Sequence, residues 1–451
     1  MIVPDGYRPR IVDGAVERFL RVFGGVQING AKWCGKTWTA RAHAMSEVSL
    51  DDEGILESAR IDKSILLYGD CPHLIDEWQL LPEVRDAVRR EIDKRASEPG
   101  QFILTGSSAP PIDAYVHSGA GRIASITMRP MSLYEQGISA GAVSLRALFA
   151  GEFTGEHGAN ASLPDIARWV CRGGWPAVVD VPIDDALLVS RSYMQSFIVD
   201  TSLRYGISQE RFRRFLGSLA RNNGAAASMS TLSADTHQAI PLGEASQAAN
   251  VNRSGVAEQP RTNKRTKELA QGTITNYLEL AQNQYVIELL GGWAPALKAK
   301  ERLRSRPKRY FVDPSLAAAM LNLHPQRLIG QTQHLGILFE NLCLRDVRIY
   351  ASGIEWGMEP NLYYYRDNNG LEADVIIELP DGRWGAIEIK LGMNKAEEAA
   401  KSLLKLRHIV QANPQSQLPD PSFLMVLVGV GNYALQRPDG VYVVPINLLG
   451  P

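Results

Sequence analysis

Short apolar runs alternate with helical periodicity over the first 145 residues. Residues 25–29 and 101–104 have the pattern of buried strands, and residues 37–44 follow the first of them with a helical pattern. Another short strand, Leu74-Ile75, ends at two acidic residues. Strands that alternate with helices predict an α/β domain with a parallel sheet, and ligands of such sheets bind at the carboxyl ends of the strands. We assign residues 1–145 to this domain.

The middle of the chain has a helical pattern with two interruptions. Residues 146–205 predict a helical lid or linker, broken at Gly173-Gly174-Trp175-Pro176. Residues 206–320 hold three helical segments and then two short strands, an order that predicts a winged helix-turn-helix domain. A polar stretch near 235–265 falls between the second and third helices. It has almost no aromatic or periodic apolar content, and we expect it to be disordered.

Residues 321–451 predict a further α/β domain in the order αβββαβ. The expected elements are a helix over 335–348, strands over 362–365, 373–379 and 384–391, a helix over 395–410 and a strand over 423–430. Pro380-Asp381-Gly382 lies between the second and third strands. If these residues form a three-residue hairpin loop, Asp374 lies directly opposite Glu388.

Composition narrows the class of protein. Hydrophobic residues make up 45% of 451, as is usual for packed globular proteins, and 48 basic against 49 acidic residues leave a net charge of -1. This balance excludes a broadly basic surface for nucleic acid or membranes. The apolar runs are shorter than the roughly 18 residues of a membrane span. The N-terminus lacks a secretion signal and the 4 cysteines are scattered, so we expect a cytoplasmic protein with reduced thiols and no membrane association.

One segment departs from this neutrality. Residues 253–309 hold 12 Lys and Arg against 5 Glu, a net of +7. Six of these cations lie between the two strands of the predicted wing: Lys298, Lys300, Arg302, Arg304, Arg306 and Lys308. A basic wing is typical of contact with DNA phosphates, and equally of a solubilising or protein-binding loop. The segment therefore leaves both DNA and protein open as partners.

A complete nucleotide-binding pattern follows the first strand. The residues are Gly30, Ala31, Lys32, Trp33, Cys34, Gly35, Lys36 and Thr37, which fit G-x-x-x-x-G-K-[ST]. The glycines let backbone N–H groups fold around phosphate, and Lys36 reaches the terminal phosphates. The Thr37 hydroxyl ligates Mg²⁺ at the start of a helix. The pattern predicts a P-loop that binds ATP with Mg²⁺.

Residues after the other strands supply further parts of an ATPase site. Asp76 is expected to hold the Mg²⁺ shell, and Glu77 to orient the attacking water. Ser107, which follows the strand at 101–104, is expected to sense the γ-phosphate. Arg122 and Arg129 are candidate arginine fingers, and of the two we favour Arg122. Each of them is equally compatible with a structural role.

Acidic residues and a lysine gather on the predicted C-terminal hairpin. Asp374 and Glu388, about 5 Å apart, with Lys390 two residues along, suit a second divalent metal, Mg²⁺ or Mn²⁺, that activates water against a phosphodiester. Glu340 adds a carboxylate from the preceding helix. The set resembles the PD-(D/E)xK nuclease fold. It is equally compatible with a nuclease-like fold that has lost its activity.

Several further segments carry a family resemblance. They are residues 7–13, 30–37, 74–79, 102–108 and 128–133 in the first domain, and residues 310–313, 336–340 and 371–374 later in the chain. Together they resemble a prokaryotic AAA-type P-loop ATPase family whose members carry a C-terminal domain of unknown function (DUF4143). The resemblance implies an AAA-type ATPase domain, a winged helix and a restriction-endonuclease-like C-terminal domain.

Two functions are compatible with these features. In the first, the nucleotide state of an ATPase gates a C-terminal half that binds DNA through the basic wing and cleaves it with a divalent metal. In the second, the chain is a nucleotide-dependent signalling or defence switch that recruits protein partners. Nucleotide binding would then change the state of a homo-oligomer, and the nuclease-like fold would be catalytically inert.

Overall fold

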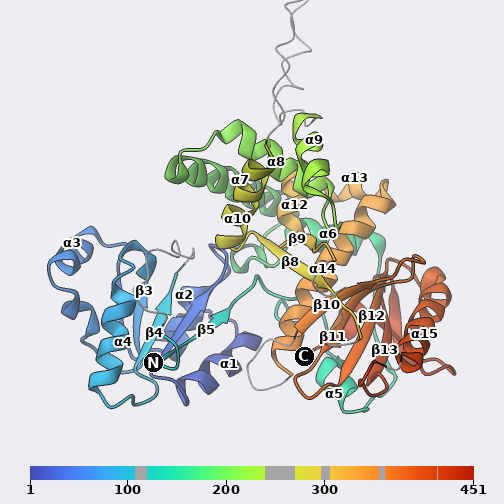
Figure 1. Ribbon diagram of the computed structural model, residues 1–451, viewed down its shortest axis with the longest axis horizontal. Helices are drawn as coiled ribbons and strands as arrows, with labels where there is room; N and C mark the ends of the chain where they lie inside the picture. Colours follow the sequence, from blue (N-terminus) through green and yellow to red (C-terminus); the bar gives the residue numbers. More distant parts are fainter. Residues whose placement is uncertain (107–118, 239–269, 296–304, 355–360, 414) are drawn as a thin grey trace, which may run out of the picture.

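Two separate β-sheets organise the chain, with a group of helices between and above them (Figure 1). The computed structural model describes residues 1–106, 119–238, 270–295, 305–354, 361–413 and 415–451. Within these ranges, no helix combines the length and the apolar character that a membrane crossing requires.

The first sheet is parallel throughout and has the order β2-β3-β4-β1-β5. Its strands are β1 (Gly25–Asn29), β2 (Ser46–Ser49), β3 (His73–Asp76), β4 (Phe102–Thr105) and β5 (Ile123–Thr127). The flanking helices are α1 (Ile11–Leu20), α2 (Lys36–His43), α3 (Glu53–Ile61) and α4 (Val84–Lys94). Residues of β3 and β4 are buried throughout, as is usual in a parallel sheet covered on both faces. The predicted α/β domain is confirmed.

The second sheet has nine strands in the order β7-β14-β15-β13-β12-β11-β10-β8-β9. They are β7 (Glu156–Ala161), β8 (Ile287–Gly292), β9 (Lys308–Phe311), β10 (Asn361–Arg366), β11 (Glu372–Glu378), β12 (Trp384–Lys390), β13 (Phe423–Val428), β14 (Gly431–Gln436) and β15 (Tyr442–Pro445). The strands predicted for the wing, β8 and β9, continue this sheet because β8 pairs in parallel with β10. The domain boundary predicted at residue 321 therefore separates β8 and β9 from strands of the same sheet, β10 to β15.

The helices between the sheets come from the middle of the chain. They are α5 (Leu145–Phe149), α6 (Leu163–Arg172), α7 (Ile183–Tyr205), α8 (Gln209–Arg221), α9 (Met229–Gln238), α10 (Gln271–Asn283), α12 (Pro314–Met320) and α13 (Pro325–Ile329). Three of them, α8, α9 and α10, are the helices expected of the winged helix. The disordered stretch expected near 235–265 begins inside α9, and its residues from 239 onward lie outside the described residues.

Not all of the segment predicted as a helical lid is helical. Residues 156–161 form β7, which pairs antiparallel with the edge strand β14. Its six residues, Glu-His-Gly-Ala-Asn-Ala, have no strong apolar alternation, so the strand forms because an unpaired sheet edge is available to it. Just before α5, the two-residue strand β6 (Val143–Ser144) pairs with β16 (Leu449–Gly450) near the end of the chain.

The C-terminal elements follow the predicted αβββαβ order. The long helices are α14 (Thr332–Ser352) and α15 (Ala396–Ala412), and they pack on the strands β11 to β13 (Figure 1). Val375 lies opposite Ile387, and Glu378 lies opposite Trp384. This is the register expected of the three-residue hairpin loop, so that prediction is confirmed.

A buried ion cluster joins four distant segments of the chain. Arg345, on α14, donates from Nη1 to Asp313 Oδ2 (2.7 Å) and from Nε to Asp346 Oδ1 (2.9 Å). The Arg345 side chain is 1% exposed and both carboxylates are fully buried. Asp313 Oδ2 also accepts from the N–H of Gly174, and Asp346 Oδ2 accepts from the N–H of Leu133, each at 2.9 Å. The cluster thus ties the start of α12, α14, the turn at 173–174 and the end of the first domain together.

Gly174 is required by this arrangement. The N–H of Met131 donates to Gly174 O at 2.6 Å, so the two backbones lie against each other. A Cβ at position 174 would overlap the carbonyl oxygen of Met131, which is backbone and cannot turn away. The glycine pair that interrupts the helical pattern therefore marks a close backbone contact between the first domain and the helices.

Substitution Arg345→Met is expected to destabilise the chain by about 3–5 kcal/mol, because it leaves two carboxylates buried without a cation. Urea denaturation followed by circular dichroism measures the change. The matched control is Arg366→Met, which removes an exposed ion pair with Glu372 (3.0 Å) and should cost less than about 1 kcal/mol. Equal losses of stability in the two variants would contradict the role of the cluster.

Candidate functional site

The predicted P-loop runs from the end of β1 to the first turn of α2. Gly30 and Gly35 adopt positive φ angles of 147° and 104°, and a Cβ at Gly30 would overlap the carbonyl oxygen of Met128. The Lys36 side chain is buried, and its Nζ donates to the Ala31 carbonyl at 2.8 Å. The ammonium therefore lies over the loop backbone, where a P-loop binds phosphate.

The Thr37 hydroxyl and Asp76 meet at the carboxyl edge of this sheet. Thr37 Oγ1 donates to Asp76 Oδ2 at 3.1 Å, and the N–H of Glu77 donates to Asp76 Oδ1 at 3.0 Å. Thr105, at the end of β4, also donates its hydroxyl to Asp76. Oxygen donors of this kind are the ligands that Mg²⁺ prefers. Together with the glycine cradle and Lys36, they fit a nucleotide with Mg²⁺.

Glu77 has a left-handed backbone conformation, with φ 54° and ψ 36°. For a residue other than glycine such a conformation costs on the order of 1–3 kcal/mol, and residues of this kind cluster at functional sites. Gln79 donates from its side-chain amide to the Glu77 carboxylate. The turn and the amide together fix the direction of Glu77. No sequence pattern indicates a role for Gln79. Thr105 begins the hydroxyl-rich run of residues 105–108, in which we expect Ser107 to sense the γ-phosphate.

The predicted arginine finger lies far from the loop. Arg122 directly precedes β5, and its carbonyl accepts from the N–H of Gly25 at 3.0 Å, at the amino edge of the sheet. Five residues of β1 separate this edge from the P-loop, roughly 16 Å at a strand's rise per residue. Arg122 Nε pairs with Asp93 (2.9 Å), so the expectation is corrected: Arg122 does not face a nucleotide on its own chain.

The other two residues predicted near the phosphates are Arg129 and Ser107. Arg129 follows β5 at the correct edge of the sheet, but it is buried and pairs with Glu288 of β8 at 2.8 Å, as a structural arginine does. Ser107 lies outside the described residues.

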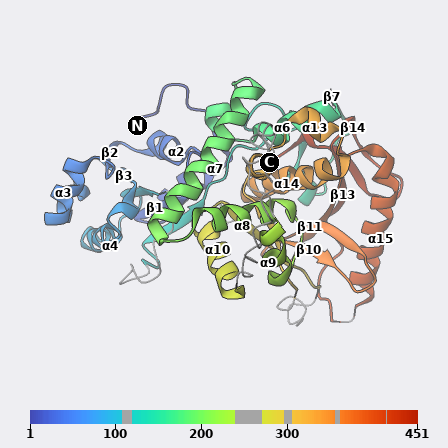
Figure 2. The same ribbon diagram turned by 90° about the horizontal axis from the view of Figure 1, so that it is seen from above.

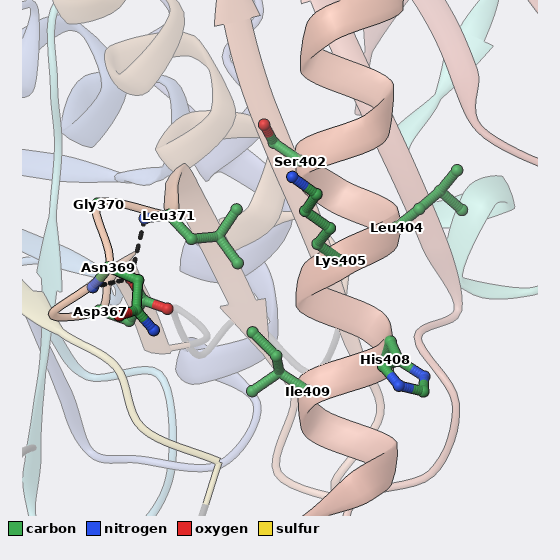
Figure 3. Close-up of a pocket in the computed structure, with 9 residues that line it drawn as sticks. All are labelled: Asp367, Asn369, Gly370, Leu371, Ser402, Leu404, Lys405, His408 and Ile409. Carbon is green, nitrogen blue, oxygen red and sulfur yellow. Dashed lines mark hydrogen bonds between the residues drawn. The ribbon is translucent and has the colours of Figure 1, made fainter.

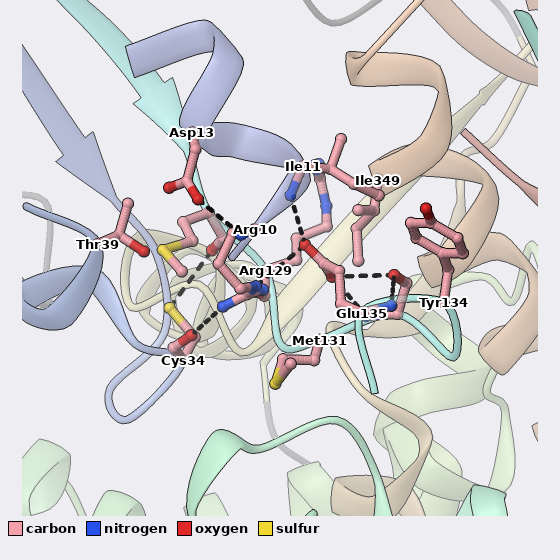
Figure 4. A network of polar contacts seen from close by, with 12 residues as sticks. Arg10, Ile11, Asp13, Cys34, Thr39, Arg129, Met131, Tyr134, Glu135 and Ile349 are labelled. Carbon is pink, nitrogen blue, oxygen red and sulfur yellow. Dashed lines mark hydrogen bonds and ion pairs between the residues drawn. The ribbon is translucent and has the colours of Figure 1, made fainter. Parts of the chain in front are cut away.

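Arg10 holds the P-loop from behind, and no sequence pattern assigned it a role (Figure 4). Its Nη1 donates to the Cys34 carbonyl at 2.9 Å, and its Nη2 donates to the Arg129 carbonyl at 2.8 Å. Its Nε pairs with Glu135 Oε1 at 3.0 Å, and both side chains are almost fully buried. Glu135 also accepts from the N–H groups of Ile11 and Ser132. One guanidinium therefore links the P-loop to the exit of β5.

Helix α7, part of the predicted lid, lies against the other side of the loop (Figure 2). Lys32 Nζ lies 3.2 Å from Asp200 Oδ2, and the Trp33 ring contacts the Tyr193 ring at 6.5 Å between centroids. Cys34 is buried, with its Sγ directed at the Met128 carbonyl. Lys32, Trp33 and Cys34 of the loop therefore all contact other segments of the chain.

The predicted carboxylates of the C-terminal domain come close together around a β-bulge. Tyr363 pairs with Ile376 and Tyr365 with Ala373, so two residues, one of them Asp374, stand opposite a single residue of β10. A bulge re-aims a side chain away from the regular alternation of a strand. Asp374 Oδ2 accepts from the N–H of Ile389 at 2.8 Å.

Glu388 lies opposite Asp374, one step beyond the Val375–Ile387 pair in the same register. Its Oε1 accepts from Lys390 Nζ at 2.7 Å, and its buried Oε2 has no hydrogen-bond partner among the residues that the structure describes. Burial, and after it the charge of Asp374, raise the pKa of Glu388 to about 8, although Lys390 acts in the opposite direction. The cluster concentrates negative charge in a poorly hydrated position.

Lys308, predicted as a cation of the wing, belongs to this cluster instead. Its Nζ lies 3.1 Å from Glu340 Oε1 and 3.8 Å from Asp374 Oδ1, and its side chain is 12% exposed. Burial lowers its pKa, but Glu340 and Asp374 outweigh burial and the pKa lies above its usual value. Arg309 is buried too, and donates to the Ala227 carbonyl. Lys308 and Arg309 are both counted in the net charge of +7, so this value overstates the positive charge available for DNA. The wing residues Lys298, Lys300, Arg302 and Arg304 lie outside the described residues.

The cluster does not fit a divalent metal as it stands. In the described part of the chain, no group of three or more His, Cys, Asp or Glu side chains is arranged to hold a metal ion. Glu340, Asp374 and Glu388 are brought together, but an ammonium lies between the first two.

A cavity of about 660 Å³ opens between the β10–β11 turn and α15 (Figure 3). Asp367 and Gly370 line it from the turn, and Lys405, His408 and Ile409 line it from the helix. None of the predicted site residues lines it.

Three family models match the chain. An AAA domain matches residues 24–136, a domain of unknown function (DUF8612) matches residues 163–327, and another (DUF4143) matches residues 335–449. The chain therefore carries an AAA-type ATPase domain, followed by two domains whose families have no assigned function.

Similar proteins add little about function. Uncharacterized proteins Rv2008c of Mycobacterium tuberculosis and Mb2031c of Mycobacterium bovis are each 24% identical over 372 residues, covering 81% of this chain and 70% of theirs. The Walker-type ATPase PABY2304 of Pyrococcus abyssi is 11% identical with a TM-score of 0.41, and covers 71% of this chain and 100% of its own. A replication initiator DnaA bound to AMPPCP and single-stranded DNA is 11% identical with a TM-score of 0.27, over 62% of this chain and 90% of its own. With TM-scores below 0.5, neither structure assigns an activity to this chain.

Substitution Arg10→Lys is expected to weaken nucleotide binding and to lower stability. A lysine keeps a positive charge beside Glu135, but its single nitrogen cannot replace the separate Nη1 and Nη2 atoms that reach the carbonyls of Cys34 and Arg129, and each buried carbonyl left unpaired costs about 1–3 kcal/mol. Thermal unfolding and titration with a fluorescent ATP analogue measure both effects. The control is Arg8→Lys, at an exposed arginine that pairs with Asp180. Unchanged unfolding and affinity in Arg10→Lys would show that the contact with Cys34 does not support the loop.

Proposed function

We propose that this chain binds ATP with Mg²⁺ and hydrolyses it, and that its nucleotide state acts on its C-terminal half. The observation that carries the proposal is the contact between the Thr37 hydroxyl and Asp76, beside a buried Lys36 at the end of the P-loop. This combination places a cation for the phosphates and oxygen ligands for Mg²⁺ at one edge of the sheet.

In this proposal, one group of residues binds the nucleotide and the metal, and another activates water. Backbone N–H groups of residues 30–37 and the Lys36 ammonium bind the phosphates, while Thr37 and Asp76 would hold the metal. Bound Mg²⁺ supplies neutralisation of the charge on the phosphates. Glu77, held by its turn and by Gln79, orients the attacking water and accepts its proton.

Contacts behind the loop supply the route to the C-terminal half. Arg10 connects the Cys34 carbonyl to Glu135, and Glu135 accepts from Ser132. The next residue, Leu133, donates its N–H to Asp346 of α14. A shift of the P-loop on binding or losing the γ-phosphate would therefore reach α14 through buried polar contacts.

The second candidate function is metal-dependent cleavage of DNA by the C-terminal domain. It is favoured by the position of Asp374 opposite Glu388, with Lys390 alongside and one buried oxygen of Glu388 unpartnered. Because Lys308 stands between Glu340 and Asp374, cleavage would require this lysine to move. The competing alternative is a switch that recruits proteins, in which the same fold is inert.

Substitution Glu77→Gln is expected to retain ATP binding and to lower turnover by on the order of 10²–10⁴-fold, because a positioned base is lost. Lys36→Ala should lose both binding and turnover. Phosphate release and equilibrium binding of labelled ATP separate the two steps. Turnover at the wild-type rate in Lys36→Ala would remove the ATPase proposal.

For cleavage, the wild-type chain with ATP and Mn²⁺ is expected to nick supercoiled plasmid, and Asp374→Ala should leave the plasmid intact. Gel electrophoresis of the plasmid reads out the reaction. Asp381→Ala, at an exposed acid in the hairpin loop, serves as the matched control. Intact plasmid with the wild-type chain under every nucleotide condition would favour the inert alternative.

A further inference from the structure

The carboxylate cluster of the C-terminal domain contains its own cation. Lys308 leaves the first position of β9 and reaches Glu340 on α14 and Asp374 on the bulge of β11. It therefore touches both carboxylates that face each other across the junction of helix and sheet.

Other groups in the cluster hold Lys308 in this position. Tyr310, on the same strand, donates its hydroxyl to Glu340 Oε1 at 2.6 Å, the oxygen that Lys308 also contacts. The Tyr364 ring lies 5.4 Å from Lys308 Nζ, and an ammonium over an aromatic ring is attracted to it. The lysine is thus packed between two carboxylates and a ring, as a built component of the site.

The free oxygen of Asp374 faces this lysine. Asp374 Oδ2 accepts from the backbone of Ile389, so its Oδ1 is the oxygen directed at Lys308. Within the described residues, Glu388 Oε2 has no hydrogen-bond partner. A divalent ion between Asp374 and Glu340 would lie a few ångströms from the ammonium, where the two positive charges repel each other.

The balance of charges in the cluster also indicates that Lys308 opposes metal binding. When all three are ionised, Glu340, Asp374 and Glu388 supply three negative charges against the two positive charges of Lys308 and Lys390, a surplus of one negative charge. Removal of Lys308 makes the cluster more negative by one charge whether or not Glu388 carries a proton, and so favours a divalent cation. The lysine is therefore the residue that decides whether the cluster attracts a metal.

We propose that Lys308 is the resident cation of this cluster and keeps the site free of divalent metal until the lysine withdraws. The proposal rests on the second candidate function, in which Asp374 and Glu388 form a metal site. It assigns an autoinhibitory role to the first residue of β9, and it makes metal binding, rather than the carboxylates themselves, the controlled step.

The test is Mn²⁺ binding to the full chain without nucleotide, measured as the loss of the free Mn²⁺ electron paramagnetic resonance signal. Lys308→Met is expected to gain one Mn²⁺ site, at least about tenfold tighter than any in the wild-type chain, because a nearby positive charge is removed. Adding Asp374→Asn should abolish that site. Lys395→Met, at an exposed lysine of the same domain, should behave as wild type.

Each other outcome overturns the proposal in a recognisable way. Equal Mn²⁺ affinity in wild type and Lys308→Met would refute the block by Lys308 while leaving the metal site and cleavage intact. Absence of Mn²⁺ binding in both would refute the block and the metal site together. If Lys308→Met loses its fold, recovery of the native melting transition on adding Mn²⁺ supports the proposal, and a chain that stays unfolded contradicts it.

Discussion

The buried pairing of Arg345 with Asp313 and Asp346 is the interaction on which the arrangement of this chain depends. Neither carboxylate has access to water, so each must be satisfied by the guanidinium and by backbone N–H groups. Those N–H groups belong to Gly174 and Leu133, in segments far apart in sequence. These buried charges cannot move far apart, because a charge that loses its partner remains buried without compensation, which is strongly destabilising. The cluster therefore fixes where the first domain sits against the helices and α14.

A second buried pair, Arg10 with Glu135, extends this constraint to the nucleotide loop. Arg10 contacts the Cys34 carbonyl directly, and Glu135 lies two residues after the backbone that binds Asp346. The loop and the ion cluster are therefore connected through a few polar contacts. Six residues before Asp346, α14 carries Glu340 into the carboxylate cluster with Lys308. The candidate nucleotide site and the candidate C-terminal site thus share one helix and its buried charges.

Local patterns predicted the parts of the structure that local chemistry determines. The P-loop, the strand before it, Asp76 and the hairpin register of Asp374 and Glu388 follow from glycines, apolar runs and loop length. The rest depends on long-range contacts. Neither the joining of β7, β8 and β9 into one sheet nor the bulge at Asp374 leaves a periodic signal, because sheet edges and bulges are set by the partner strand. In the sequence, Lys308 and Arg122 look like ordinary exposed cations. Only the fold shows that Lys308 is enclosed and that Arg122 lies at the edge of the first sheet opposite to the P-loop.

We expect the nucleotide loop and α14 to respond to nucleotide as one unit. Hydrogen–deuterium exchange with and without a non-hydrolysable ATP analogue measures this response, with Lys36→Ala as the control that should not respond. Nucleotide should alter protection in three places: the loop at residues 30–37, the connecting segment at 129–135, and α14 at 332–352. Protection that changes only in the loop, while α14 exchanges identically in both states, would contradict it.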